Sequence, residues 1–282
     1  MFEFMVYKYL RLYAKFILRF FVRNIEVQGL ENFSKKTALL IASNHPNSFF
    51  DAVVEACILD RPVHPLTRGD AFKNPMANKF LSSINMLPIF RISEGIENMG
   101  KNDKTFEKCN EVFNNNGAVL IFSEGLCAHQ KTLLPLKKGT GRMALQSWQQ
   151  GSDLEVLPVS IKYDSFSNFG KNIKMNIGKS IIHEDFADLE PRDGVFVSNF
   201  NIVLSNRLKE LSEGELSLPK WNSNLIYWLG WLVNFPLYLL LSAIVKSKTR
   251  GTVFYDSILY GAILLTLPFY WLILGLLLAW IF

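Results

Sequence analysis

Residues 37–51 read TALLIASNHPNSFFD: an apolar run of strand length, a cluster of turn-forming residues, and the start of a segment with helical periodicity. Within this stretch five residues separate His45 from Asp51. A histidine oriented by a carboxylate is the usual arrangement for taking a proton from a hydroxyl group, so the pair is a candidate catalytic site. The alternative is a polar turn in which Asp51 caps the following helix.

Apolar runs of strand length alternate with longer helical segments between about residues 25 and 215. The expected strands are 39–42, 86–90, 119–122 and 156–161. The expected helices are 51–59, 74–83, 103–115 and 138–150. This alternation predicts an α/β domain with a mixed, partly parallel sheet flanked by helices. In such sheets the chemistry gathers just past the carboxyl ends of the strands.

Charged residues follow two more of these strands. Arg91 ends the second run, with Arg68 ahead of it, and a planar guanidinium suits phosphate. The alternative for Arg91 is an exposed or salt-bridged surface arginine. Glu124 and Gly125 follow the third run, where the carboxylate could hold a hydroxyl group, another site residue or a cation. The alternative there is a loop with an exposed Glu124.

Two further features concern the second half of this domain. Lys137 and Lys138 precede a helix start, which makes them a plausible anion site, although the glycines nearby do not match a nucleotide-binding loop. The fourth run contains Pro158, so we expect this strand at a sheet edge or at a bulge. It could form a wall of the substrate site or serve packing alone.

The composition indicates contact with lipid. Hydrophobic residues make up 49% of the chain, aromatic residues 13%, and the net charge is +5. That charge fits anionic membrane surfaces or phosphate-bearing substrates, whereas basic residues interleaved with aliphatic runs argue against nucleic acid. The three cysteines form no Cys-x-x-Cys pair and the four histidines are scattered, so neither a disulfide framework nor a metal site is expected.

The two ends of the chain differ from its middle. Residues 1–24 are predicted to form an amphipathic helix in the membrane interface, since Lys8, Arg11, Lys15 and Arg19 share one face among many aromatic residues. The alternative is a surface helix packed on the domain. Residues 25–216 would form the main domain, and residues 217–282 a membrane hairpin.

Within the hairpin, 225–245 and 257–282 are long uncharged runs with flanking Trp and Tyr, each sufficient to cross a bilayer. Two buried core helices are the alternative. Spanning would place Lys246, Lys248 and Arg250 on the side opposite the basic N-terminal domain, against the positive-inside tendency. Pro236 and Pro268 could instead break the segments into a re-entrant hairpin.

These blocks, in this order, resemble the glycerolipid acyltransferase superfamily over roughly residues 25–165. The family's first motif is matched by Asn44-His45 and Asp51, and its second by Arg91. Its third, Phe-Pro-Glu-Gly, is matched by Phe122-Ser123-Glu124-Gly125, and its fourth by the strand around Pro158.

The chain departs from the family pattern in three places. Five residues separate His45 from Asp51 instead of four, which looks like the branch with fungal-type glycerol-3-phosphate acyltransferases. Ser123 replaces the usual proline. Residues 126–128, Leu-Cys-Ala, replace the common Thr-Arg-Ser and so lack a basic residue near the substrate phosphate, for which Lys137, Lys138 or Arg142 could compensate.

The resemblance implies a membrane-bound enzyme that carries a fatty acyl group from acyl-CoA or acyl carrier protein to the hydroxyl of 1-acylglycerol-3-phosphate, giving phosphatidate. His45 would be the general base and Asp51 would orient it, with no metal and no cofactor. The residues expected to contact substrate are Asn44, Arg68, Arg91, Glu124, Gly125, Lys137 and Lys138. The expected location is the inner (cytoplasmic) membrane, with the catalytic domain on its cytoplasmic face.

Other functions remain open at this point. The acceptor could be glycerol-3-phosphate, or another single-chain lipid such as a lysophospholipid or an N-acyl amino acid. A non-catalytic lipid-binding protein would need a substitution at His45 or Asp51, and neither residue is missing. A hydrolase would usually carry a Gly-x-Ser-x-Gly elbow or a metal set, which the sequence lacks.

Overall fold

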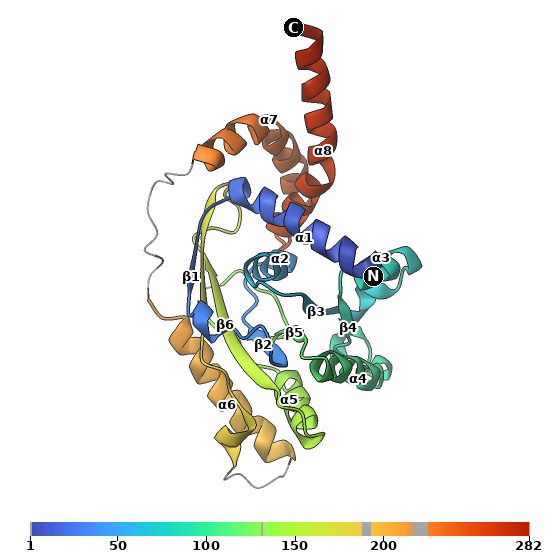
Figure 1. Ribbon diagram of the computed structural model, residues 1–282, viewed down its shortest axis with the longest axis vertical. Coiled ribbons are helices and arrows are strands. Elements are labelled where there is room, and N and C mark those ends of the chain that lie inside the picture. The colour runs from blue at the N-terminus through green and yellow to red at the C-terminus, as the bar shows by residue number, and fades with distance from the viewer. Residues whose placement is uncertain (1, 131, 188–192, 215, 217–224, 282) are drawn as a thin grey trace.

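The computed structural model describes residues 2–130, 132–187, 193–214, 216 and 225–281. In this part of the chain seven strands form one sheet in the order β1-β7-β6-β2-β5-β3-β4 (Figure 1). The strands are β1 (Val22–Gln28), β2 (Leu39–Ser43), β3 (Val63–Arg68), β4 (Leu87–Ile89), β5 (Ala118–Phe122), β6 (Glu155–Tyr163) and β7 (Lys171–Ile177).

The sheet is mixed and partly parallel, which confirms the predicted fold class. Strands β6, β2, β5, β3 and β4 run parallel to one another, whereas β7 is antiparallel to β6 and parallel to β1. The carboxyl ends of the five parallel strands therefore share one edge of the sheet, and the amino end of β7 lies at that same edge. Side chains that follow these strands are brought together there.

Helices cover both faces of the sheet. The helices are α1 (Phe2–Phe21), α2 (Phe49–Ile58), α3 (Pro75–Ser83), α4 (Lys101–Asn114), α5 (Gly139–Gln149), α6 (Asp193–Leu211), α7 (Leu225–Lys248) and α8 (Tyr255–Ile281). Leu40 of β2 packs in a cluster with α4, α5 and α6, while Leu39 and Ile41 pack in a cluster with α2. All three side chains are fully buried, as expected for a central parallel strand covered on both faces.

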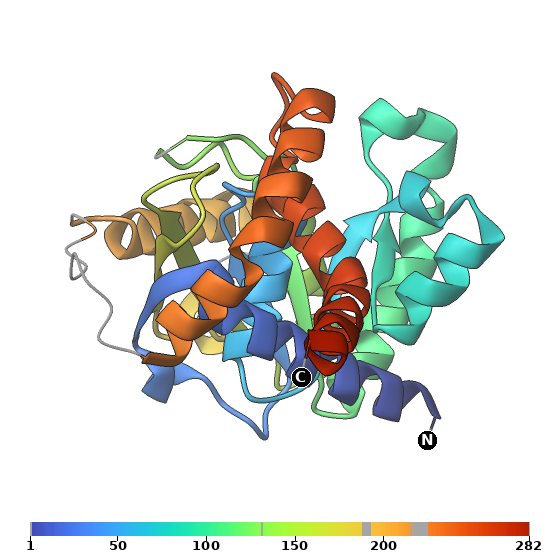
Figure 2. The same cartoon turned by 90° about the horizontal axis from the view of Figure 1, so that it is seen from above.

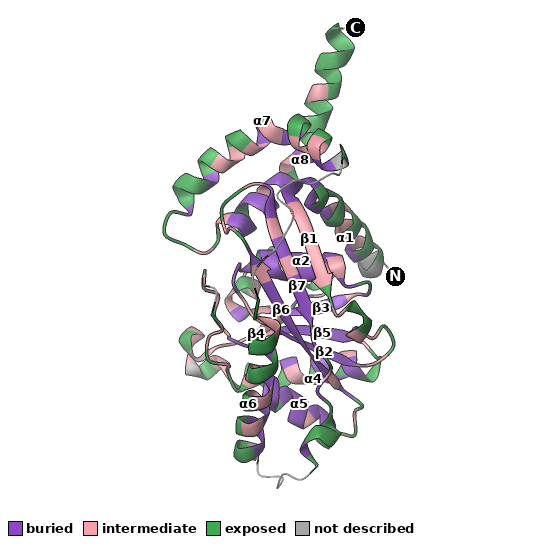
Figure 3. Cartoon of the chain, turned by 90° about the vertical axis from the view of Figure 1, so that its left-hand side faces the viewer, coloured by how far each residue is buried: buried purple, intermediate pink, exposed green. Residues whose placement is uncertain are grey.

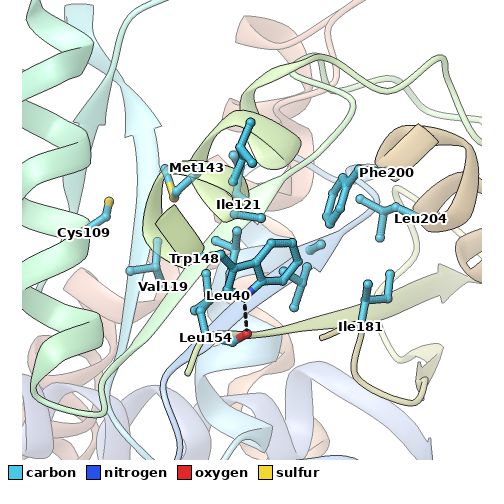
Figure 4. Packing of buried hydrophobic residues seen from close by; sticks show 14 of the residues in the cluster. Leu40, Cys109, Val119, Ile121, Met143, Trp148, Leu154, Ile181, Phe200 and Leu204 are labelled. Carbon is cyan, nitrogen blue, oxygen red and sulfur yellow. Dashed lines mark hydrogen bonds between the residues drawn. The ribbon is translucent and has the colours of Figure 1, made fainter. Parts of the chain in front are cut away.

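Trp148 of α5 lies at the centre of the first cluster (Figure 4). Its ring packs edge-on to Phe196 and Phe200 of α6, and its indole N–H donates to the carbonyl of Leu154 at 2.8 Å. A buried tryptophan needs such an acceptor, because an unpaired indole N–H would be costly. This packing fixes α5 and α6 on the face opposite α2.

Pro158 does not lie at a sheet edge, so that part of the expectation was wrong. Its strand β6 lies between β7 and β2, and Pro158 is paired with Ala42 of β2. The position tolerates proline because the ladder on the β7 side is irregular. Val156 pairs with Ile181, and the Pro158 carbonyl accepts the Gly178 N–H. One residue of β6 therefore lies opposite two residues, 179 and 180, of the segment that follows β7. The expected bulge is therefore present, and it lies next to the missing N–H.

Helix α1 lies across the base of α8 (Figures 1 and 2), where the Tyr260 hydroxyl donates to the Ala14 carbonyl at 2.6 Å. One of its four basic residues, Arg11, points to the end of α2 and donates to the carbonyls of Ala56 and Leu59, each at 2.6 Å. A cation there satisfies carbonyls at the helix C-terminus. Lys8, Lys15 and Arg19 are exposed, and contact of this helix with a bilayer remains a prediction.

The domain boundaries also remain predictions. Helix α1 ends at Phe21 and β1 begins at Val22, so the boundary expected after residue 24 falls within β1. The boundary expected between residues 216 and 217 borders 217–224, which lie outside the described residues.

The C-terminal pair α7 and α8 differs from the rest of the molecule. Residues Tyr227–Lys248 (22 residues) and Tyr255–Ile281 (27 residues) are long and apolar enough to cross a membrane by length and composition. The outer part of α8 projects away from the domain and is exposed (Figures 1 and 3). Pro236 and Pro268 lie inside continuous helices, so neither proline interrupts its segment.

Candidate active site

His45 and Asp51 form a hydrogen-bonded pair at the carboxyl end of β2. Their Nδ1 and Oδ2 atoms are 3.0 Å apart. The same oxygen accepts the backbone N–H of Asn47 at 2.8 Å, and the Asp51 side chain is fully buried. A carboxylate that only accepts hydrogen bonds fixes the proton of the imidazole on Nδ1, which leaves the Nε2 lone pair to act as a base.

Tyr163 holds the other oxygen of Asp51. The residue ends β6, which lies beside β2, and its hydroxyl donates to Asp51 Oδ1 at 2.7 Å. Burial, together with the nearby charge of Asp51, raises the pKa of Tyr163 well above its ordinary value, so the hydroxyl keeps its proton and remains a donor. No local pattern in the sequence points to this partner, which lies 112 residues from Asp51.

The turn between β2 and α2 accommodates the five-residue spacer through an unusual backbone at Ser48. Its φ is 56° and its ψ is −140°, a conformation that non-glycine residues rarely adopt. The Ser48 N–H donates to Sγ of Cys127 at 3.0 Å, and the Asp51 N–H donates to the Ser48 carbonyl at 3.1 Å. The longer spacer therefore still brings Asp51 onto His45. Cys127 lies where the superfamily often has arginine.

Glu124 supports the histidine through the backbone. One of its carboxylate oxygens accepts the His45 N–H at 2.9 Å, and the other accepts the Leu134 N–H at 2.9 Å. Burial raises the pKa of Glu124, while these two hydrogen bonds oppose the rise. The ring of Phe122 stacks on the imidazole of His45, with 3.8 Å between their centroids. Direct contact between Glu124 and substrate remains a prediction.

Ser123, which replaces the usual proline, makes three hydrogen bonds. Its N–H donates to the Ser43 carbonyl at 3.0 Å, its carbonyl accepts the Lys137 N–H at 2.8 Å, and its hydroxyl accepts from Thr140 at 3.0 Å. A proline has neither the N–H nor the hydroxyl. The serine therefore ties the ends of β2 and β5 and the start of α5 together.

Asn44 is held by the sheet. Its amide donates to the carbonyl of Ile161 at 3.0 Å and accepts the N–H of the same residue at 2.8 Å. Both ends of the side chain are thus used within the protein, and they fix the start of the turn that carries His45 and Asp51 against β6. The expected contact of Asn44 with substrate stays a prediction.

Arg91 reaches the same edge of the sheet. Its Nη1 donates to the carbonyl of Gly125 at 3.0 Å, and its Nε donates to Glu94 at 3.0 Å. Arg91 thus lies next to Gly125, at the candidate site, and also forms the ion pair that the alternative predicted. Its contact with a phosphate remains a prediction. Gly125 has a φ of 63°, and a Cβ there would lie 2.8 Å from Lys137, so the lysine stem packs over the glycine.

The other two candidate phosphate-binding residues, Arg68 and Lys138, have no direct contact with His45 or Asp51 among the described interactions. Arg68 pairs with Asp70, and both side chains are partly exposed. The Asp70 N–H donates to Glu94 at 3.3 Å, which links this pair to Arg91. Lys138 is exposed and stands at the N-cap position of α5, where it lines a groove between α6 and the segment that precedes α5. His45 does not line this groove. Among the described residues, His, Cys, Asp and Glu form no group of three that could hold a metal ion.

A cavity of about 580 Å³ opens beside the loop that carries Arg91. Phe90 and Glu94 line it from this loop, and Asp70 and Lys73 line it from the segment after β3. His45 is not among its lining residues. The cavity therefore borders the Arg91 side of the candidate site and not the His45–Asp51 pair.

Comparison with known proteins gives one family match and one structural match. Residues 24–162 match the family model described as Acyltransferase. Among solved structures, the chain is similar to the 1-acyl-sn-glycerophosphate (LPA) acyltransferase PlsC from Thermotoga maritima, with 18% sequence identity and a TM-score of 0.54. The likeness covers 76% of this chain and 82% of that chain, and at this identity it concerns the fold. No curated protein matches the chain.

Proposed function

Because this chain belongs to the glycerolipid acyltransferase superfamily and is an acyltransferase, we propose that it acylates 1-acylglycerol-3-phosphate, giving phosphatidate. The donor is a fatty acyl thioester, either acyl-CoA or acyl carrier protein. One observation carries this proposal: a histidine oriented by a buried aspartate lies at the sheet edge that also carries Arg91, beside the base of the apolar helix α8.

The reaction needs one base. His45 Nε2 takes the proton of the acceptor hydroxyl while the hydroxyl oxygen attacks the thioester carbonyl. The new C–O bond forms, the C–S bond breaks, and the leaving thiolate takes the proton from the imidazolium. Asp51 stabilises the imidazolium and keeps the ring oriented, as in other His–Asp pairs. A hydroxyl nucleophile on the enzyme is not required by this scheme.

Arg91 is the proposed contact for the acceptor phosphate. Its side chain is partly exposed, it is tied to Gly125, and the stem of Lys137 packs over that glycine. A guanidinium held by two hydrogen bonds is preorganised for oxygen pairs. Arg68, paired with Asp70, would assist from further out.

The apolar helices support a lipid acceptor. Leucine and isoleucine side chains on α7 and α8 are widely exposed, for example Leu240, Leu265 and Leu276. Such a surface is stable in a bilayer and unfavourable in water. An acceptor that already carries one acyl chain would reach His45 from this side. We place the protein in the inner membrane, with the catalytic domain on the cytoplasmic face.

The test is acyl transfer by purified full-length protein in detergent. Labelled acyl-CoA and acyl carrier protein would be offered with 1-acylglycerol-3-phosphate, glycerol-3-phosphate, a lysophospholipid and an N-acyl amino acid, and both acylated lipid and free fatty acid would be measured. We expect phosphatidate as the main product. A preference for another acceptor would overturn the substrate assignment, and release of free fatty acid alone would indicate a hydrolase.

An Arg91→Gln variant tests the phosphate contact. We expect the ratio of kcat/KM for 1-acylglycerol-3-phosphate to that for monoacylglycerol to fall by about 10–100-fold, the range for a lost hydrogen bond to a charged group. Arg207→Gln, on the exposed face of α6, is the matched control. An equal loss with both acceptors would assign Arg91 a structural role instead.

A further inference from the structure

The first turn of α8 is hydrogen-bonded to the turn that carries the catalytic pair. The carboxylate of Asp256 accepts the side-chain amide of Asn47 at 2.7 Å. The hydroxyl of Ser257 accepts the Phe50 N–H at 3.0 Å and donates to the Asn47 carbonyl at 3.3 Å. These contacts join segments about 200 residues apart (209, 207 and 210 residues).

Ser257 supplies what the turn itself lacks. A serine at the N-cap position normally accepts an N–H of the first helical turn, but Ser48 makes no such side-chain hydrogen bond to α2. The Phe50 N–H, one of the N–H groups left unpaired by the helix itself, is accepted by Ser257. The next residue is Asp51. The hydroxyl of α8 thus caps the helix at the position that aims the catalytic carboxylate.

Asn47 is held on three sides. Its N–H donates to Asp51, its side-chain amide donates to Asp256, and its carbonyl accepts from Ser257. The side chain is fully buried. The backbone orientation of Asn47 therefore decides whether its N–H reaches Asp51 Oδ2. This oxygen is the same atom that orients His45.

A buried cation secures Asp256. The ammonium of Lys171, at the amino end of β7, pairs with the same carboxylate oxygen, and both side chains are almost fully buried. Lys171 also lies over the rings of Phe21 and Phe50, 5.6 and 5.7 Å from their centroids. A buried ion pair of this kind makes one arrangement much more favourable than its alternatives, because either charge alone would be strongly unfavourable.

We propose that α8 belongs to the acyl-transfer machinery: Asp256 and Ser257 are positioning residues that hold the catalytic turn so that Asp51 orients His45. The match to the acyltransferase family ends at residue 162, so this role falls to a segment outside it. The inference rests on the proposed function for its kinetic test. Its structural content, an ordered turn held by α8, can be measured independently.

The first experiment compares Ser257→Ala with two controls in the full-length protein. Ser257→Thr keeps the hydroxyl, and Thr266→Val removes a hydroxyl on the same helix that donates to the Ala262 carbonyl of α8. We expect Ser257→Ala to lower kcat about 5–10-fold with the acceptor KM within about two-fold, and both controls to remain near the wild type. A raised KM with unchanged kcat, or an equal loss in Thr266→Val, would overturn the proposal.

A second comparison separates the hydrogen bond to Asn47 from the ion pair. Both double variants, Asp256→Asn with Lys171→Met and Asp256→Leu with Lys171→Met, remove the two charges together. Only the asparagine can still accept from Asn47, so we expect its kcat to be about 10-fold the higher of the two. Equal kcat values would contradict the positioning role.

Hydrogen–deuterium exchange supplies a readout that needs no turnover. Exchange of the backbone amides in residues 44–51 should accelerate about 5–10-fold in Ser257→Ala and stay unchanged in Thr266→Val. Unchanged exchange in both variants would overturn the inference. If the amides respond but no acceptor is acylated by the wild type, the inference on positioning stands and the proposed function is wrong.

Discussion

The turn from Ser43 to Asp51 and the pair of helices α7 and α8 represent two opposite uses of buried and exposed surface. In the turn, Asn47 and Asp51 are fully buried polar residues that bond to each other, and β6 and α8 supply further hydrogen-bond partners from outside the turn. In the helical pair, large apolar side chains are exposed along most of the length, and the buried residues of α8 all lie between Asp256 and Leu267. The turn needs a single geometry, whereas the helices need only an apolar surrounding.

The contrast shows where the two regions depend on each other. A buried polar network is specific because an unmade hydrogen bond there is costly. An apolar helix surface in lipid is tolerant, since one leucine can replace another. The two regions meet at Asp256 and Ser257. Both residues lie in the first turn of the apolar helix α8, and their side chains are hydrogen-bonded to the buried polar network of the turn. Substitutions on either side of this junction should therefore have very different effects on kcat.

The largest effect is expected at the centre of the turn. We predict that His45→Ala lowers kcat by about 10²–10⁴-fold, because the proposed general base is lost. His183→Ala, at an exposed position beside Trp148, is the matched control and should keep full activity. Initial rates of acyl transfer and thermal unfolding of both variants provide the measurement. Substantial activity in His45→Ala would rule out this mechanism.

The second largest effect on kcat is expected when the same Tyr→Phe substitution is compared beside the turn and in the helical pair. Tyr163→Phe removes the hydroxyl that donates to Asp51, and we expect kcat to fall about 5–10-fold. Tyr270→Phe removes a hydroxyl that donates to the Val233 carbonyl within the helical pair, and kcat should stay within about two-fold. Steady-state kinetics of the two variants measure the difference. Equal losses would mean that the two regions are not distinct.

A third prediction concerns the pH dependence of stability near the turn. Glu55 is fully buried, one helical turn after Asp51, and accepts a hydrogen bond from Ser43 at 2.6 Å. Burial raises the pKa of Glu55 from 4.5 to about 8, and the nearby Asp51 adds to the rise. The stability that the protonated carboxyl contributes is thus fully present below pH 4.5 and is lost as the pH rises to about 8.

Glu55→Gln should remove that dependence. We expect the free energy of unfolding of the wild type to fall, relative to the variant, by on the order of 1 kcal/mol per pH unit within this window. Denaturant unfolding of both proteins at several pH values measures it. Glu210→Gln, on the exposed part of α6, is the control. Parallel curves for the wild type and Glu55→Gln would show that folding does not raise the pKa of Glu55.

The smallest effect on catalysis is expected at the far end of α8. Replacing Leu276 and Leu277 with serine should weaken partitioning into lipid vesicles severalfold, because apolar surface that contacts lipid is lost. With a short-chain, water-soluble acceptor, kcat should stay within about two-fold. Met76→Ser, on the exposed side of α3, is the control for partitioning. A large fall in kcat would show that the outer part of α8 also acts on the turn.

The local part of this picture could be predicted from the sequence. The strands expected at 39–42, 119–122 and 156–161 are present within a few residues, because apolar runs bounded by turn residues report burial directly. Helices α2, α3, α4 and α5 were predicted equally well. The strands β1, β3 and β7 were missed because charged or polar residues interrupt their apolar pattern, as Arg23, His64 and Lys171 do.

By itself the sequence determined the fold class, the apolar C-terminal helices and the pair His45 and Asp51, since each depends on residues close together in the chain. Only the tertiary structure decided which groups hold that pair. Tyr163 lies 112 residues from Asp51, and Asp256 lies 209 residues from Asn47. No periodicity or spacing encodes such contacts: they arise when the sheet aligns the strand ends and α8 packs on the turn they form.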